Sequence, residues 1–485
     1  MFNQTLELLL ILLLIFTPIA FGAMDLWAAS LMESAILFMI VLYAIRWGIF
    51  YKLGNPQSTI SSRSPDSAIR NPQSAIPLSF FSLFLFGLFL CLILFQMLPL
   101  PPAVMKAVSP RTYEIRHFLL NGPPLEPSAD SYPLSFGLFA TEIQFLKWLA
   151  LIGLFVFLRI WDLPGEEDRR LKRLVLVVFL VGVFESLYGM FEVFSGHNQS
   201  LTFKLSDASV AGTFISRNIL AGYLLMVIPL STGFLLWRER GGKLHYGGWR
   251  HRLSSLDGKT VLLGFGIIVM VLALLFSASR MGITSLFLSI TVSAFLFRSP
   301  VGGKRISKVP ILILGLALLW AAWIGLDAVA GRFLVTSEDF GHRWAVWLDT
   351  ARIVRDFPLF GTGLGTFWQV FPMYRSFHLI GFTEHAENDF LQLASEAGLI
   401  GMGFLLILFA SFFYKAVSGV RSLSLRDPRR YVGMGGLVGI LALMFHSLVE
   451  KNIQIPSNVF LFTFIFALAL HVGKEPDKLN NSTTQ

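Results

Sequence analysis

Polar residues gather in one short stretch of an otherwise apolar chain. HAENDFLQLASEAGLIG, residues 385–401, places His385, Glu387, Asn388, Asp389 and Glu396 within twelve positions, where a membrane helix should begin. A histidine whose unperturbed pKa is about 6.5 is suited to removing a proton from an alcohol. The stretch therefore predicts His385 as a general base, with the residues around it as its support.

Two arginines elsewhere in the chain are expected at the outer face of the membrane. Arg280 in FSASRMG falls between two apolar segments, and Arg343 in GHRWAVW begins an amphipathic stretch. A guanidinium pairs bidentately with phosphate oxygens, so two of them suit a diphosphate. A lipid diphosphate would present its phosphates at the membrane interface and bury its tail between helices. Arginines and histidine together indicate transfer of a group from a lipid diphosphate to a hydroxyl.

Simpler interpretations account for part of the polar set. Asn388 or Asp389 is placed to cap the next helix, and Asp389 with Gln392 has the spacing of a capping box. Glu387 and Asp389 form an acidic pair, which we interpret as a solvated capping pair rather than a metal site. FGTGLGTF, residues 360–367, is expected to be a flexible turn. It resembles a phosphate loop in its letters only, because no strand precedes it.

The composition indicates a membrane protein. Of 485 residues, 54% are hydrophobic and 14% are charged, whereas soluble domains carry about 25% charged residues. Apolar runs of about 20 residues recur, each long enough to span a bilayer as a helix. We predict an all-α polytopic fold with one transmembrane domain over residues 1–473. The lone Cys91 excludes an internal disulfide.

Twelve membrane helices are expected, and the first is interpreted as a retained helix because MFNQT carries no basic residue. The expected helices cover residues 5–22, 27–50, 77–98, 140–158, 174–194, 213–237, 260–279, 281–297, 310–329, 395–414, 432–449 and 457–473.

The distribution of Lys and Arg sets the orientation. One set of loops holds 26 of these residues, and the other holds the remaining 13 of 39. The positive-inside rule makes the first set cytoplasmic, together with both termini and the tail at 474–485. The Ser- and Pro-rich repeat at 51–76 is then a disordered cytoplasmic linker. Two large loops, 99–139 and 330–394, face the periplasm. The net charge of +9 thus reports topology and indicates no nucleic-acid partner.

Several segments together resemble the O-antigen ligase and polymerase family, whose members are membrane glycosyltransferases of bacterial cell envelopes. The strongest resemblance lies in SASRMG, HRWAVWLDTARIVRDFPLFGTGLGTF and HAENDFLQLASEAGLIG. GTFISRNILAGYL resembles the family's GTF-x-N-x-N-H-x-A-G, with Ser216 and Ile219 in place of the expected Asn and His. HSLVEKNIQIPSN, residues 446–458, resembles a late helix pair, with Glu450 where Asp is common.

The resemblance implies a GT-C-like fold in the bacterial inner membrane, surrounded by membrane lipids, with its site facing the periplasm. The donor would be a glycan on undecaprenyl diphosphate, and an acceptor hydroxyl would attack with inversion. By position, His385 would be the base, and the substrate-binding residues would be Arg280, Arg343, Arg217 and Asn388. The first outer loop, around Asp25, is too short to hold the acidic residues of metal-dependent relatives, so we expect no metal or other cofactor.

The acceptor stays open at this point. A lipid A core would make the protein a lipopolysaccharide ligase, a second lipid-linked repeat a polymerase, and a Ser or Thr side chain a protein O-oligosaccharyltransferase. We favour ligase or polymerase, because no separate protein-binding domain is visible. A solute or anion transporter is the alternative from another class. Glu185 and His446 are the main expected buried ionisable groups, but the polar set clusters at the outer face, which disfavours transport.

The orientation can be tested by labelling. Cysteines introduced at Ser128 and Ser376 should react with a membrane-impermeant thiol reagent in intact spheroplasts, because both loops are expected outside. A cysteine at Ser67 should stay unlabelled until the membrane is broken. The reverse pattern would overturn the orientation and the placement of the site with it.

Overall fold

Helices account for most of the residues that the computed structural model describes. The structure describes residues 2–53, 79–120, 131–161, 167–195, 210–241, 257–297, 337–377, 383–425 and 427–473. Three predicted segments fall mainly or wholly outside these ranges: the helix at 310–329, most of the 51–76 linker and the tail at 474–485.

The all-α polytopic architecture is confirmed. Eight helices within the described ranges are long and apolar enough to cross a membrane. They are α1 (Phe2–Ile19), α2 (Leu26–Leu53), α3 (Phe80–Met97), α6 (Leu138–Ile160), α7 (Glu167–Phe194), α8 (Arg217–Gly241), α10 (Gly258–Phe276) and α16 (Asp389–Ser422). Three further helices also coincide with predicted spans: α11 (Arg280–Leu296), α17 (Arg429–His446) and α18 (Pro456–Val472). The total of twelve spans stays a prediction.

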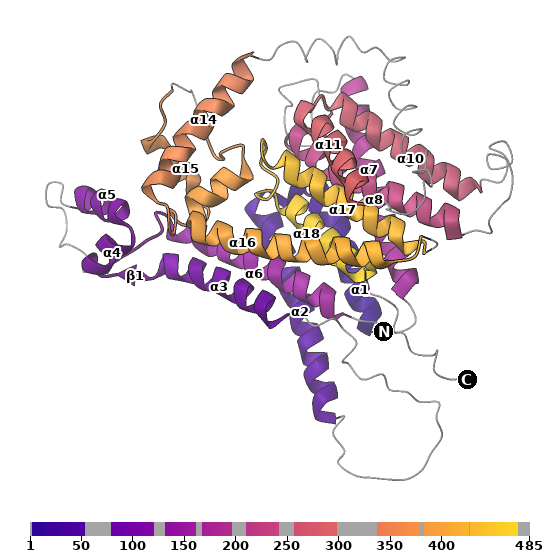
Figure 1. The fold of residues 1–485 in the computed structure, drawn as a ribbon, viewed down its shortest axis with the longest axis horizontal. Coiled ribbons are helices and arrows are strands. Elements are labelled where there is room, and N and C mark those ends of the chain that lie inside the picture. Colours follow the sequence, from indigo (N-terminus) through magenta and orange to yellow (C-terminus); the bar gives the residue numbers. More distant parts are fainter. Residues whose placement is uncertain are drawn as a thin grey trace.

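Helix α8 forms the centre of the bundle. Of the residues in its most apolar 18-residue stretch, 94% are buried. Helices α17, α7, α10 and α18 pack around it (Figure 1). The contact with α17 depends on small residues, because a Cβ added at Gly435 would lie 2.3 Å from the Pro229 carbonyl oxygen. Close backbone approach of this kind drives helix association in membranes, where the hydrophobic effect between helices is lost. The middle of α8 is therefore packed directly against the backbone of α17.

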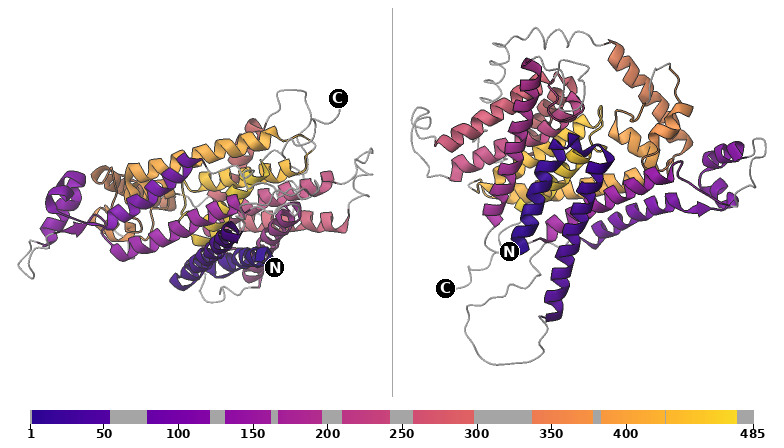
Figure 2. Two further views of the ribbon diagram at one scale, coloured as in Figure 1. Left: turned by 90° about the horizontal axis from the view of Figure 1, so that it is seen from below. Right: turned by 180° about the vertical axis from the view of Figure 1, so that it is seen from behind.

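Short elements gather at one end of the bundle. The first large loop contains β1 (Pro99–Leu100), α4 (Pro102–Val108), α5 (Pro110–Leu120) and β2 (Tyr132–Pro133), with the two strands antiparallel. The second contains α14 (Ser337–Asp356), α15 (Phe367–Val370) and the 3-10 turn η3 (Phe371–Met373). Figures 1 and 2 place both groups at the end of the molecule where α3 ends and α16 begins. A small apolar core of Val346, Ile353, Phe357, Phe367 and Phe371 holds the second group together.

Helix α14 has the two faces that the sequence pattern predicts. Trp344 and Leu348 are exposed, while Val346 and Ile353 are buried. The helix begins at Ser337, earlier than Arg343, and ends at Asp356, just before Pro358. The exposed aromatic face is the one expected to lie at the membrane interface.

Helix α16 is longer than predicted and is broken near its start. It begins at Asp389 rather than 395, and Gly398 has a left-handed φ of 68° within it. The segment after α14 pairs with this break, because Leu399 N–H donates to Pro358 O (2.8 Å) and Gly363 N–H donates to Glu396 O (3.0 Å). FGTGLGTF is thus bonded to α16, and the expectation of a flexible turn is wrong.

The break predicts an unusual sensitivity at Gly398. A Cβ there would lie 2.1 Å from the Leu359 carbonyl oxygen, in a conformation that L residues rarely adopt. Gly398→Ala should therefore destabilise the protein by about 2 kcal/mol or more, seen as a lower thermal midpoint in detergent. Gly403→Ala is the matched control on the same helix, since nothing lies within 4 Å of its added Cβ. Equal midpoints for the two variants would contradict the role of the break.

Candidate functional site

The start of α16 positions His385 through a local hydrogen-bond network. Asn388 is the cap, since its Oδ1 accepts the N–H groups of Phe390 (3.1 Å) and Leu391 (3.0 Å). Gln392 reaches back along the chain, and its Oε1 accepts the Ala386 N–H (3.1 Å). The cap is Asn388 rather than Asp389, so the capping alternatives of the sequence are resolved. Asn388 Oδ1 is therefore occupied by the backbone of the first turn of α16.

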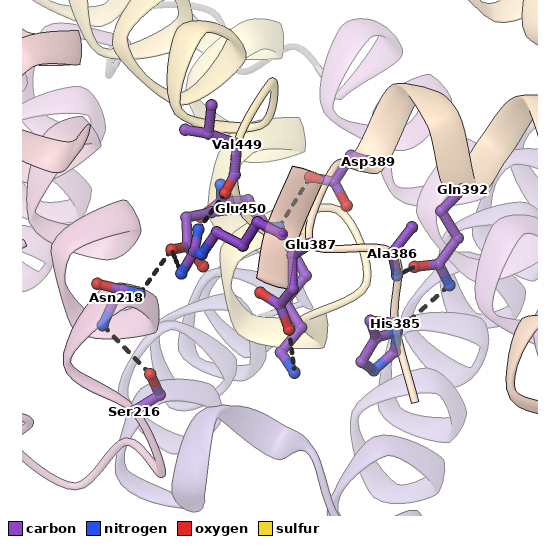
Figure 3. Close-up of polar contacts among 12 residues, drawn as sticks. Ser216, Asn218, His385, Ala386, Glu387, Asp389, Gln392, Val449 and Glu450 are labelled. Atoms are coloured by element: carbon purple, nitrogen blue, oxygen red, sulfur yellow. Dashed lines mark hydrogen bonds and ion pairs between the residues drawn. The ribbon is translucent and has the colours of Figure 1, made fainter. Parts of the chain in front are cut away.

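Gln392 also sets the protonation pattern of His385. Because its Oε1 faces the Ala386 N–H, its amide nitrogen faces His385 Nδ1 at 3.3 Å and donates to Glu396 Oε1 at 3.1 Å. An N–H donor at Nδ1 favours the tautomer that carries the proton on Nε2. In the resting arrangement the imidazole is therefore a hydrogen-bond donor through Nε2 (Figure 3).

Glu396 connects this network to the glycine-rich segment. Its two carboxylate oxygens accept the N–H groups of Gly365 (3.0 Å) and Phe367 (3.1 Å). The backbone N–H groups that a phosphate loop would offer to a nucleotide are thus occupied by a carboxylate of the same chain. Glu396 therefore supports both the glycine-rich segment and Gln392, and through Gln392 it supports His385.

Asp389 ties the start of α16 to the loop between α17 and α18, residues 447–455. Its Oδ2 accepts the N–H groups of Asn452 (2.8 Å) and Ile453 (2.9 Å), and its own N–H donates to Ser447 O (2.9 Å). Asp389 is 1% exposed, so the interpretation of Glu387 and Asp389 as a solvated capping pair is wrong. Asp389 joins two helix ends, and Glu387 pairs elsewhere, with Lys451.

Arg343 reaches the same loop from α14. Its Nη2 lies 2.6 Å from Glu450 Oε1, and its Nη1 donates to Val449 O (2.5 Å). Asn218 of α8 donates to Glu450 Oε1 from the other side (2.6 Å). In Figure 3, Asn218, Glu450, Glu387 and His385 lie in that order from left to right. Sequence reasoning missed Asn218 and Lys451; the GTF segment was the available signal for Asn218.

Buried Glu185 holds the turn that leads into α8. Its Oε2 accepts the Thr213 N–H (2.9 Å), and its Oε1 lies 2.9 Å from the Thr213 hydroxyl. That hydroxyl also lies 2.8 Å from Pro18 O of α1. The turn delivers Arg217 and Asn218 at the first two positions of α8. Glu185 is buried as predicted, and these contacts give it a structural role.

The remaining predicted residues lie at helix starts. Arg217 is the first residue of α8 and Arg280 the first of α11, where Ser279 caps the helix by accepting the Gly282 N–H. Helix α11 packs against α8 and α17, and helix N-termini favour anions. Arg343 thus contacts the 447–455 loop, and Asp389 bonds the segment that carries His385 and Asn388 to the same loop. Arg217 and Arg280 lie at the starts of neighbouring helices.

Burial and charge control the titration of the site. Burial first, and the positive charge of Lys451 second, lower the pKa of His385 to about 4, so the ring is neutral at neutral pH. Burial alone would raise the pKa of Glu387, but Lys451 and Arg343 outweigh it and hold the pKa below its ordinary value. Burial raises the pKa of Glu450, with the neighbouring Glu387 adding to the effect and Arg343 opposing it.

Part of this region is similar to a known protein family. The family model described as O-antigen ligase matches residues 265–406. The matched stretch contains Arg280, Arg343, His385 and Asn388, whereas Arg217 and the 447–455 loop lie outside it. No curated protein matches the chain.

Proposed function

We propose that this multi-pass membrane protein of the O-antigen ligase and polymerase family transfers a glycan from undecaprenyl diphosphate to an acceptor hydroxyl, with inversion. The transfer takes place at the periplasmic face of the bacterial inner membrane during envelope polysaccharide assembly. One observation carries the proposal. Within the O-antigen ligase match, Arg343 of α14 contacts the 447–455 loop, and the segment that carries His385 is bonded to the same loop through Asp389.

The donor's diphosphate binds the cations of the site. The side chain of Arg343 is 26% exposed, and Arg217 and Arg280 are the first residues of α8 and α11. These charges stabilise the undecaprenyl diphosphate that leaves when the bond between sugar carbon and phosphate oxygen breaks. The arginines supply this charge without a metal, so the proposed reaction is metal-independent.

His385 takes the proton of the acceptor hydroxyl as that oxygen attacks the anomeric carbon. The neutral ring at neutral pH suits this role. The resting tautomer carries its proton on Nε2, because Gln392 faces Nδ1. Base catalysis through Nε2 therefore requires the ring proton to move from Nε2 to Nδ1, and the Gln392 amide nitrogen to leave Nδ1, when the substrates bind. The electron pair of the broken bond leaves with the diphosphate.

The competing functions receive less support from the contacts. Glu185 and His446, the groups that a transporter would use, are held by neighbours: Thr213 binds Glu185, and the Asn452 amide nitrogen lies 3.2 Å from His446 Nδ1. Protein O-oligosaccharyl transfer would use the same donor site. Ligase and polymerase activity remain our preferred proposals for the acceptor.

Substitution of Arg343 tests the geometry of the cation. Arg343→Lys keeps the charge but loses the fork that serves both Glu450 and Val449, so glycan transfer should fall by about tenfold or more. Arg355→Lys is the matched control on α14, because its side chain is 78% exposed, and it should behave like the wild type. The assay is transfer by purified protein in nanodiscs. Full activity of Arg343→Lys would show that charge alone suffices.

Substitution of His385 tests the base. His385→Ala and His385→Gln should each reduce kcat by a factor on the order of 10²–10⁴, with donor binding retained and with no effect of a chelator. In the wild type, kcat/KM should fall only as the pH approaches about 4, where the partly buried imidazole gains its proton. Substantial activity of His385→Gln would instead assign hydrogen-bond donation to His385. Loss of activity on chelation would contradict metal independence.

A further inference from the structure

Lys451 is a second cation at the site that the proposed function leaves unused. Its Nζ lies 3.2 Å from Glu387 Oε1, and the two side chains are 22% and 27% exposed. Lys451 directly follows Glu450, the residue that Arg343 contacts. Two partly exposed cations, Arg343 from α14 and Lys451 from the 447–455 loop, thus lie beside the neighbouring carboxylates of Glu450 and Glu387.

The backbone that carries Lys451 is fixed in place. The next two residues, Asn452 and Ile453, donate their N–H groups to the buried Asp389 carboxylate. Asp389 begins the helix that also positions His385. Backbone hydrogen bonds therefore set the position of Lys451 relative to His385. A group that binds a ligand needs such support, because it must be in place before the ligand arrives.

Glu387 occupies the space between these charges under backbone strain. Its φ is 51°, in the left-handed region that non-glycine residues seldom adopt. Its carbonyl oxygen lies 3.4 Å from Trp347 Nε1, which donates to it. Both Lys451 and Arg343 favour the charged form of its carboxylate. An anion held between two cations by a strained loop occupies the position that an anionic ligand would take.

We propose that Lys451 and Arg343 together bind the diphosphate of the lipid-linked donor, and that the Glu387 carboxylate occupies Lys451 until the donor displaces it. This inference rests on the proposed function. Displacement exchanges one anionic partner of Lys451 for another, so the cation is never left without a counter-charge. Glu450 keeps its contact with Asn218 throughout, because that contact lies on the α8 side of the site.

The test is the affinity of the full-length protein in nanodiscs for undecaprenyl diphosphate, with undecaprenol as the control for tail binding. Lys451→Ala should weaken binding by about fivefold to tenfold, the order expected for one partly exposed charge contact. Lys451→Arg should stay near the wild type. Glu387→Gln should tighten binding by about fivefold, because it removes the competing anion and leaves a side chain of the same size.

The controls separate this inference from the proposed function. Lys415→Ala, on the distant half of α16, should not change the affinity. A thermal midpoint for each variant shows that it is folded, and Lys451→Gln replaces Lys451→Ala if the latter is not. Unchanged binding in Lys451→Ala, or unchanged or weaker binding in Glu387→Gln, would overturn the inference while wild-type binding still supports the function. A wild type that binds the diphosphate no better than undecaprenol would overturn both.

Discussion

The Asp389 carboxylate is the contact on which the arrangement of the site depends. It lies at the first turn of α16 and accepts two backbone N–H groups from the loop between α17 and α18. Removing a buried carboxylate with such partners would destabilise the folded protein, because the N–H groups would be left without acceptors. One side of this contact carries His385 and Asn388, and the other carries Glu450 and Lys451. The hydrogen bonds of Asp389 therefore set how His385 is placed relative to Glu450 and Lys451.

Two further carboxylates fix the remaining parts in the same manner. Glu396 holds the glycine-rich segment against the broken start of α16, and Glu185 holds the turn before α8. Each accepts backbone N–H groups that belong to a loop or a helix end, where the helix itself supplies no partner. Irregular backbone at membrane depth needs such partners, since lipid offers none. The buried acids of this protein thus stabilise the irregular segments that present the site.

The sequence predicted the parts of this structure that depend on local pattern. Apolar runs located the membrane helices, and Asn388 was one of the two expected caps. The burial of Glu185 followed from its place in an apolar run. What the sequence could not provide are pairings between distant residues. Asp389 and Asn452 are 63 positions apart, and Asn218 and Glu450 are 232 apart. No periodicity encodes which carboxylate meets which amide, and the break at Gly398 was hidden because the apolar pattern continues through it.

The exposed face of α14 has a consequence for the lipid environment. Arg343 directly precedes Trp344, which is 51% exposed on the face opposite the buried Val346 and Ile353. On the proposed topology this face rests among the lipid headgroups, as exposed tryptophans do at interfaces. The depth at which α14 settles then fixes the height of the guanidinium above the hydrocarbon. A thinner or thicker bilayer would shift the phosphates of a membrane-held donor relative to that fixed charge. The lipid composition of the membrane would therefore change how well the donor reaches Arg343.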